Sequence, residues 1–451
     1  MFRIRLKSSV VFFLFLVLIG ILHKVDEWKR NFEIVAVCHV EDWNRKTTKK
    51  IPNEEIHLQW INMNASRRDN ILGSEVRLLN AFVYPDYIAV TTTSQHSYGK
   101  LATCQYFDCN KHEIPQSSFR TVFFPSNIVY CARRFGAEYI SLKLSEDDAD
   151  YIREPVPMIY RIFDEPKHEI SVCVGPLYGN EPKWLEIIEF VEHYKLMGIN
   201  HFYFTIFDMN HYSRKILDEY LRTGEIELTV IQTEYEREDW QFHMLQINEC
   251  HQRAKYHSKW VLNVDIDERL VFAGTKMGNA ANLLINVPEN IVELSVAIQR
   301  VQKTDKIPWK YESEAQLWKE MEFLKYNISA EITWEAFKSF YRPDKSAAMY
   351  YHWSYMKYPG YESRRIDENI AYIRHYRTTE SQGLGFGWTE RYGTFHEIGL
   401  EPSFSQKLAK NVIEKVKFVY EQRVLYCDEI SREIWKEYLI WNTFNCLNRT
   451  L

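Results

Sequence analysis

An alternation of strand-like and helix-like segments between residues 170 and 264 constrains the fold of this chain more than any other feature. The expected strands are Ile170–Val174, His201–Phe207, Glu225–Ile231 and Lys259–Val264, and the expected helices are Glu181–Met197, Ser213–Arg222 and Trp240–Tyr256. Strands separated by helices of this length form βαβ units with a mostly parallel sheet. The pattern predicts an α/β domain in which ligands bind at the carboxyl ends of the strands.

Patterning divides the 451 residues into three parts. Residues 1–22 are a basic and then apolar segment, residues 23–165 a stem followed by a small β-rich domain, and residues 166–451 the α/β domain. The short alternating segments of the middle part are Glu33–Val40, Ile56–Met63, Tyr87–Thr93, Arg120–Phe124 and Tyr139–Leu144. Because no carboxylate pair ends a strand there, we expect this domain to be accessory.

The N-terminus combines a basic cluster with an uncharged run. Arg3, Arg5 and Lys7 precede residues 8–22, which cover only about 22 Å as a helix. This length is short for a bilayer span and favours a cleaved signal peptide. No small-x-small pair ends the run, however, so we predict an uncleaved anchor. The basic cluster then predicts a single-pass type II protein of the Golgi or endoplasmic reticulum membrane, with the rest of the chain in the lumen.

The cysteines agree with an oxidising compartment. None lies in a C-x2-C pair, which argues against a zinc ribbon, and their pairing stays open. The eight cysteines are Cys38, Cys104, Cys109, Cys131, Cys173, Cys250, Cys427 and Cys446. Three N-x-S/T triplets, at Asn64, Asn327 and Asn448, give weaker support for a lumenal chain.

Charge and aromatic content narrow the class of ligand. The net charge is −5, whereas nucleic-acid-binding proteins usually carry an excess of basic residues, so this class of protein is not favoured. Aromatic residues make up 15% of the chain, and flat rings can cover the apolar face of a pyranose. A large aromatic core would explain the same content.

Two aspartates follow the last of the four expected strands. If the chain stays extended there, Asp265 and Asp267 point to the same side. Paired carboxylates suit a hard divalent ion such as Mn²⁺ or Mg²⁺, and that ion stabilises a diphosphate leaving group. The pair therefore predicts a nucleotide-sugar transferase, with Asp267 as the closer metal ligand. Alternatively, the two aspartates have no catalytic role and are simply a solvated strand end or cap a helix.

From Ile170 to about Arg377 the sequence resembles glycosyltransferase family 92. The segments that carry the resemblance, besides the Asp-x-Asp pair, are Val172–Tyr178, Lys183–Glu186, Glu192–Tyr203, Asn248–Cys250, Lys338 with Arg342-Pro343, His352-Trp353 and Arg374–Arg377. Glu249 departs from the family pattern, where aspartate is expected. The resemblance implies a GT-A-like, Rossmann-type domain and a metal-dependent, inverting transfer. By analogy with characterised relatives it implies galactose from UDP-galactose as donor and fucose on a glycan as acceptor.

The same resemblance suggests substrate-binding residues. Pro176 and Tyr178 follow the first strand, where this fold receives the uracil and ribose, although a turn packed on the sheet would look the same. Lys338, Arg342 and Arg377 could neutralise diphosphate oxygens. Each of these three cations could equally be a solvated surface residue.

Two further roles have several candidates each. His352 and His375 are candidates for a third metal ligand, with His375 favoured, and a packed core histidine is the alternative for both. An inverting transferase also needs a general base for the acceptor hydroxyl. Glu335, Glu390 and Asp239 are candidates among which the sequence does not choose.

Two other functions fit parts of the pattern. A glycan-binding pseudoenzyme on the same fold would share every fold signal, but it would not need both Asp265 and Asp267. A metal-dependent hydrolase would need more clustered ligands than the sequence offers. The sequence therefore favours a UDP-sugar-dependent transferase.

Overall fold

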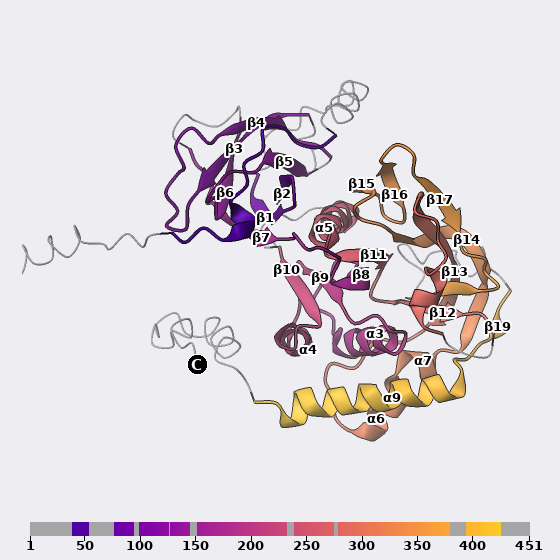
Figure 1. Cartoon of the computed structure of the whole chain (residues 1–451). Coiled ribbons are helices and arrows are strands. Elements are labelled where there is room, and N and C mark those ends of the chain that lie inside the picture. Colours follow the sequence, from indigo (N-terminus) through magenta and orange to yellow (C-terminus); the bar gives the residue numbers. More distant parts are fainter. Residues whose placement is uncertain are drawn as a thin grey trace, which may run out of the picture.

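The structure is a computed structural model, and it describes residues 38–53, 76–93, 99–125, 127–144, 151–231, 239–274, 278–378 and 394–424 (Figure 1). The predicted anchor, the expected strand Ile56–Met63 and most of Glu33–Val40 lie outside these ranges. Within these ranges, no helix is long and apolar enough to cross a membrane.

The first sheet is barrel-like. Its strands are β1 (Leu78–Val83), β2 (Tyr87–Thr92), β3 (Leu101–Phe107), β4 (Phe119–Val122), β5 (Ile128–Ala132), β6 (Tyr139–Leu144) and β7 (Val156–Tyr160). They lie in the order β4-β3-β6-β7-β1-β2-β5, and the two ends of this order meet. Phe123 bridges to Val129 there, and the Thr121 hydroxyl donates to the Tyr130 carbonyl. The β-rich character predicted for this part of the chain is confirmed.

Three disulfides lie within the described residues. Cys38–Cys109 and Cys104–Cys131 stabilise the barrel-like sheet, and Cys173–Cys250 joins the second sheet to a helix. The structure thereby decides pairings that the sequence left open. Cys427 and Cys446 lie outside the described residues.

The second sheet begins with four parallel strands in the order β10-β9-β8-β11. These strands are β8 (His168–Val174), β9 (Phe202–Ile206), β10 (Ile226–Val230) and β11 (Ser258–Val264), and the connecting helices are α3 (Trp184–Leu196), α4 (His211–Arg222) and α5 (Asp239–Ala254). Each lies within a few residues of its predicted range. Gly198 and Gly224 end the first two helices at φ 85° and φ 75°, values that glycine adopts without a steric penalty.

The sheet then continues with strands that the sequence analysis did not anticipate. They are β12 (Glu268–Phe272), β13 (Ile291–Lys303), β14 (Ile328–Tyr341), β17 (Glu362–Arg365), β18 (Ala371–Thr378) and β19 (His396–Glu397). From β11 the order runs β14-β13-β18-β12, with β14 antiparallel to both β11 and β13. A separate hairpin pairs β15 (Ser346–Met349) with β16 (Ser354–Lys357). The domain is thus mixed α/β with a curled sheet.

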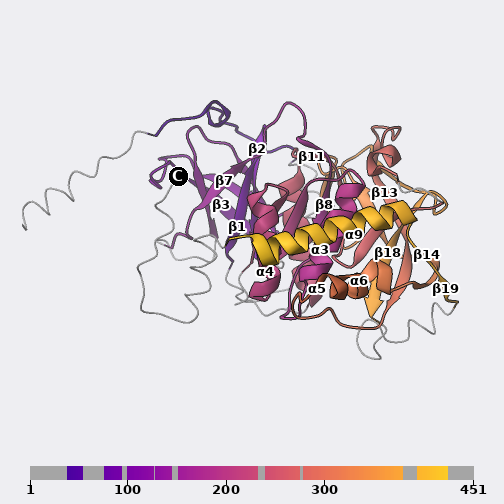
Figure 2. The ribbon, with the colours of Figure 1, turned by 90° about the horizontal axis from the view of Figure 1, so that it is seen from below.

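Helices cover both faces of the parallel strands. Val172 and Val174 of β8 share a core with α3, α4 and α9 (Pro402–Lys417), whereas Cys173 faces α5. This alternation is the period of two of a strand buried on both faces. Figure 2 shows α9 lying across α3 on the outer side. Shorter elements are η1 (Asp42–Asn44), η3 (Ala280–Leu283), α6 (Glu314–Glu320), α7 (Glu322–Lys325) and the π-helical turn η5 (Phe418–Gln422).

Candidate active site

Asp265 and Asp267 lie in the turn that joins β11 to β12. The Glu268 amide donates to the Asp265 carbonyl at 3.1 Å and closes this turn. The chain is therefore not extended here, and the same-side geometry expected of a strand does not apply. Instead the turn directs the two carboxylates toward different partners, Lys338 for Asp265 and His375 for Asp267.

Lys338 is the cation beside Asp265. Its ammonium donates to Asp265 Oδ2 at 2.7 Å and lies 3.1 Å from Glu268 Oε2. The pairing of Asn263 with Ser339 brings β14 alongside β11 and places this lysine at the site. Burial would raise the pKa of Asp265, but the charge and hydrogen bond of Lys338, together with the charges of His243 and His375, outweigh burial and lower that pKa. The structure thus brings together two residues that the sequence placed in one site.

Asp267, Glu268 and His375 form a second group. His375 Nε2 lies 3.2 Å from Asp267 Oδ2, and His375 Nδ1 lies 3.4 Å from Glu268 Oε1. The register of β12 against β18 makes Glu268 and His375 direct cross-strand partners. Burial lowers the pKa of His375, but the two carboxylates outweigh it and raise that pKa above its usual value. One ligand atom from each residue lies within 4.8 Å of the others, an arrangement that can hold a metal ion.

Glu268 was not a predicted site residue. Its side chain is fully buried, and its Oε2 atom also accepts a hydrogen bond from the Asp265 backbone amide at 2.8 Å. A buried carboxylate needs such partners, because desolvation disfavours its charge. The only sequence signal was its position directly after Asp267.

Two more histidines surround the carboxylates. His352 precedes β16, and the charges of Lys338 and Asp265 act on its ring. Burial and then Lys338 lower the pKa of His352 to about 3. Among the described residues, its Nδ1 has no hydrogen-bond partner. His243 of α5, with Nε2 3.7 Å from Asp265 Oδ1, is a neighbour that the sequence analysis missed.

Gly175 leaves the space that Asp265 occupies. Its amide donates to the Val264 carbonyl at 2.9 Å, and a Cβ built on it would lie 2.1 Å from Asp265 Oδ1. Glycine is therefore required by close approach rather than by its backbone angles. Pro176 and Tyr178 follow at the end of β8, and the Tyr178 side chain is 43% exposed.

Arg342 is not brought to the carboxylates. Its guanidinium binds the Glu289 carboxylate and the Val287 carbonyl and lies 4.6 Å from the Trp260 ring centroid. It lies four residues beyond Lys338, about 13 Å along an extended chain. Its charge is therefore engaged in packing the far end of β14.

The remaining candidates differ in position. Arg377 of β18 lies close enough to Asp267 for its charge to lower the pKa of that carboxyl. Glu335 lies in β14 where the register against β13 shifts, next to Ala336 at φ 59°. Asp239 is the first residue of α5, and Glu390 lies outside the described residues.

Comparison with known families assigns the chain to a family. The sequence profile of glycosyltransferase family 92 matches residues 168–433, more than half of the chain. The chain belongs to glycosyltransferase family 92. The match confirms the resemblance seen from Ile170 to Arg377 and extends it past Arg377, where the sequence analysis found none. Membership of this family implies a sugar donor and an acceptor.

Solved structures add little to the family 92 assignment. The crystal structure of S. aureus TarS is 14% identical, covers 56% of this chain and 44% of that chain, and has a TM-score of 0.25. The structure of S. aureus TarS 1-349 is 15% identical, covers 56% of this chain and 73% of that chain, and has a TM-score of 0.24. The match thus spans less than half of the first TarS chain, and TM-scores this low support no argument. No curated protein matches the chain.

The close approach at Gly175 gives a first prediction for the family 92 site. Gly175→Ala forces its new Cβ against Asp265 Oδ1, 2.1 Å away, so the carboxylate must move. Displacements of about 1 Å in an active site can cost about 10²-fold in rate, and we expect a loss of this order in UDP release from a UDP-sugar. Gly399→Ala is the control, because no atom of the described residues, apart from its chain neighbours, lies within 4 Å of the position that its Cβ would take. Equal rates for the two variants would contradict this packing argument.

The raised pKa of His375 gives a second prediction, for the metal-free protein. The imidazolium stabilises the folded state fully below the unfolded pKa of about 6.5, and this contribution is lost as the pH rises through the higher folded pKa. We therefore expect the difference in unfolding free energy between wild type and His375→Gln to shrink from pH 6 to pH 9. Urea unfolding at each pH measures it, with the exposed His112→Gln as control. If the difference in unfolding free energy between wild type and His375→Gln grew with pH, the raised pKa of His375 would be refuted.

Proposed function

We propose that this family 92 chain transfers a hexose, galactose from UDP-galactose, to a glycan acceptor with inversion and with Mn²⁺ or Mg²⁺. The observation that supports it is the group of Asp267, Glu268 and His375 beside Asp265, directly after a parallel strand. Two carboxylates and an imidazole are suitable ligands for Mn²⁺. The site also lies at the carboxyl ends of the strands, where α/β sheets bind their ligands.

The residues of this chain would divide the work as follows. Asp267, Glu268 and His375 would hold the ion, which when bound supplies positive charge to the diphosphate. Lys338 holds Asp265 in place at 2.7 Å, so that Asp265 is positioned for the donor ribose as well as the ion. Arg377 adds a second positive charge near Asp267. The half-exposed Tyr178 offers a ring on which the uracil can stack.

Deprotonation of the acceptor is assigned to a carboxylate. An inverting transfer needs one general base opposite the leaving group. We propose Glu335 or Glu390 for this role. Glu335 belongs to the same strand as Lys338. Its placement in the irregular part of β14 allows its side chain to differ in direction from a regular strand residue.

The test is UDP release by the lumenal fragment, residues 23–451, with a panel of UDP-sugars and glycan acceptors, some ending in fucose. We expect release that requires Mn²⁺ or Mg²⁺ and is fastest with UDP-galactose. Glycan binding without UDP release from any donor would favour the pseudoenzyme. Metal-dependent cleavage of a glycan without any UDP-sugar would favour the hydrolase.

We also propose that the chain is a type II protein of the Golgi or endoplasmic reticulum membrane. The basic residues before the apolar run of residues 8–22 support this topology. The disulfides of the described residues agree with an oxidising lumen. Sequencing the mature N-terminus tests it, because a start near residue 21–26 would show a cleaved and secreted form.

A further inference from the structure

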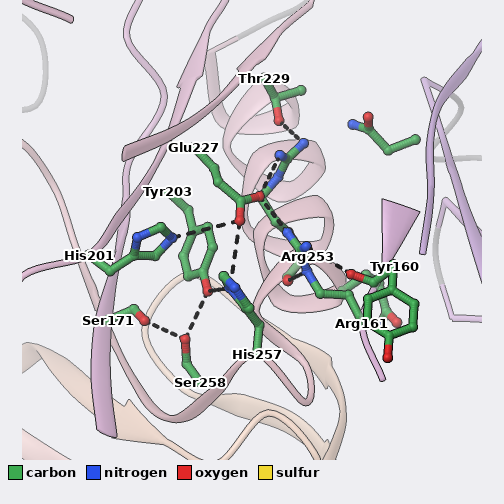
Figure 3. Close-up of polar contacts among 12 residues, drawn as sticks. Tyr160, Arg161, Ser171, His201, Tyr203, Glu227, Thr229, Arg253, His257 and Ser258 are labelled. Carbon is green, nitrogen blue, oxygen red and sulfur yellow. Dashed lines mark hydrogen bonds and ion pairs between the residues drawn. The ribbon is translucent and has the colours of Figure 1, made fainter. Parts of the chain in front are cut away.

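A second cluster of possible metal ligands lies at the amino ends of the parallel strands. His168 is the first residue of β8, His201 directly precedes β9, and His257 directly precedes β11. Glu227 of β10 faces His201 and His257 (Figure 3), so four adjacent strands contribute residues to the cluster. The seven residues of β8 separate this cluster from Gly175 and the Asp265 turn, about 20 Å at ~3.3 Å per residue. The cluster is therefore distinct from the proposed transferase site.

The ligand atoms of this cluster are close together. One nitrogen from each of His168, His201 and His257 lies within 4.8 Å of the others. Glu227 Oε1 lies 3.8 Å from His201 Nε2 and 3.6 Å from His257 Nδ1. Donor atoms around a tetrahedral zinc are roughly 3.3 Å apart, given bonds of about 2.0–2.1 Å. Small side-chain rotations, chiefly of the half-buried His168 that now stacks on His201, would complete such a sphere.

The ring nitrogens of His201 are available for a ligand. Its side chain is buried, with 5% exposure, yet neither ring nitrogen has a hydrogen-bond partner among the described residues. The 3.8 Å separation from Glu227 is too long for a hydrogen bond. Burying a polar group without a partner is unfavourable, and a bound ion would supply the missing partner.

The surroundings orient Glu227 toward the histidines. Arg161 and Arg253 both bind its Oε2 atom, Arg253 at 3.1 Å, which leaves Oε1 facing His201 and His257 (Figure 3). The Tyr203 hydroxyl lies 2.7 Å from His257 Nδ1 and orients this ring, so Nε2 is the His257 nitrogen that remains for an ion. Fixed partners of this kind commonly position metal ligands.

We propose that His168, His201 and His257 bind one Zn²⁺ ion through ring nitrogens and that Glu227 supplies a carboxylate oxygen as the fourth ligand. Imidazole and carboxylate donors suit this borderline ion, whereas the carboxylate-rich group around Asp267 suits a harder one. The ion joins the amino ends of β8, β9, β10 and β11. Through Arg161, which follows β7, it also stabilises the junction with the barrel-like sheet.

The experiment uses the lumenal protein with its proposed transferase site disabled by Asp267→Asn, so that the two sites are read separately. The protein is purified without chelators, its zinc content is measured by elemental analysis, and Co²⁺ is exchanged for Zn²⁺. We expect one zinc per chain and the intense visible absorption of tetrahedral Co²⁺. His201→Gln should weaken Zn²⁺ binding at least about 100-fold, because loss of orienting groups alone costs ~10–100-fold. His251→Gln is the matched control, as His251 is a fully buried histidine of α5 outside the cluster.

Three results would overturn the proposal. They are substoichiometric zinc in the parent protein, Co²⁺ with only weak octahedral bands, and zinc retention by His201→Gln equal to that of His251→Gln. If His201→Gln fails to fold, the zinc content and Co²⁺ spectrum of the parent protein decide. None of these measurements depends on transferase activity.

Discussion

Asp267→Asn is expected to lower metal-dependent UDP release about 10²–10³-fold, the loss seen when one well-placed electrostatic contact to a reacting group is removed. Asp267 Oδ2 lies 3.2 Å from His375 Nε2, within the group that can hold the ion. Its side chain is a quarter exposed and lies in the turn at the carboxyl end of β11, where α/β sheets bind their ligands. Asparagine keeps the shape but removes the charge, so the ion binds weakly and the leaving diphosphate is less compensated.

The measurement is calorimetric titration of UDP into wild type and Asp267→Asn, with and without Mn²⁺, alongside UDP-release rates. We expect Mn²⁺ to strengthen UDP binding only in wild type. Asp86→Asn is the matched control, because Asp86 is exposed in the barrel-like sheet and pairs only at the surface with Lys46. Unchanged affinity and metal dependence in Asp267→Asn would refute the site and most of the proposed mechanism.

Lys338→Met is expected to destabilise the metal-free protein by about 3–5 kcal/mol, the usual loss when one partner of a buried ion pair is removed. Lys338 is 2% exposed and serves both Asp265 and the fully buried Glu268. Without the lysine, His375 at 3.4 Å is the one cationic side chain among the described residues that still pairs with the buried Glu268 carboxylate, so its charge is less compensated. Because Asp265 is 31% exposed, most of the loss should come from Glu268.

Chemical unfolding of chelator-treated protein measures this loss. Adding Glu268→Gln to Lys338→Met should recover part of it, because the uncompensated charge disappears. The control is Lys259→Met, which removes a solvent-exposed pair with Glu169 and should cost less than about 1 kcal/mol. If both lysine variants lost equal stability, or the double variant were no better than Lys338→Met, the buried-charge explanation would be wrong.

Local patterning was enough to predict the first half of the α/β domain. Each strand from β8 to β11 is a short apolar run, and each helix between them has its own periodicity and, twice, a terminating glycine. These signals act over a few residues, so the sequence displays them directly. The same holds for Asp265 and Asp267, because a motif placed directly after a buried strand predicts its own location in such a fold.

Tertiary structure decided which of the distant candidate residues reach the two aspartates. Lys338 reaches Asp265 because β14 runs antiparallel to β11, and His375 meets Glu268 because β18 pairs with β12. Strand pairings between segments 70 to 110 residues apart depend on the packing of the whole sheet, which no local pattern encodes. The turn at Asp265, the approach of Gly175 and the gathering of three histidines at the opposite strand ends have the same origin.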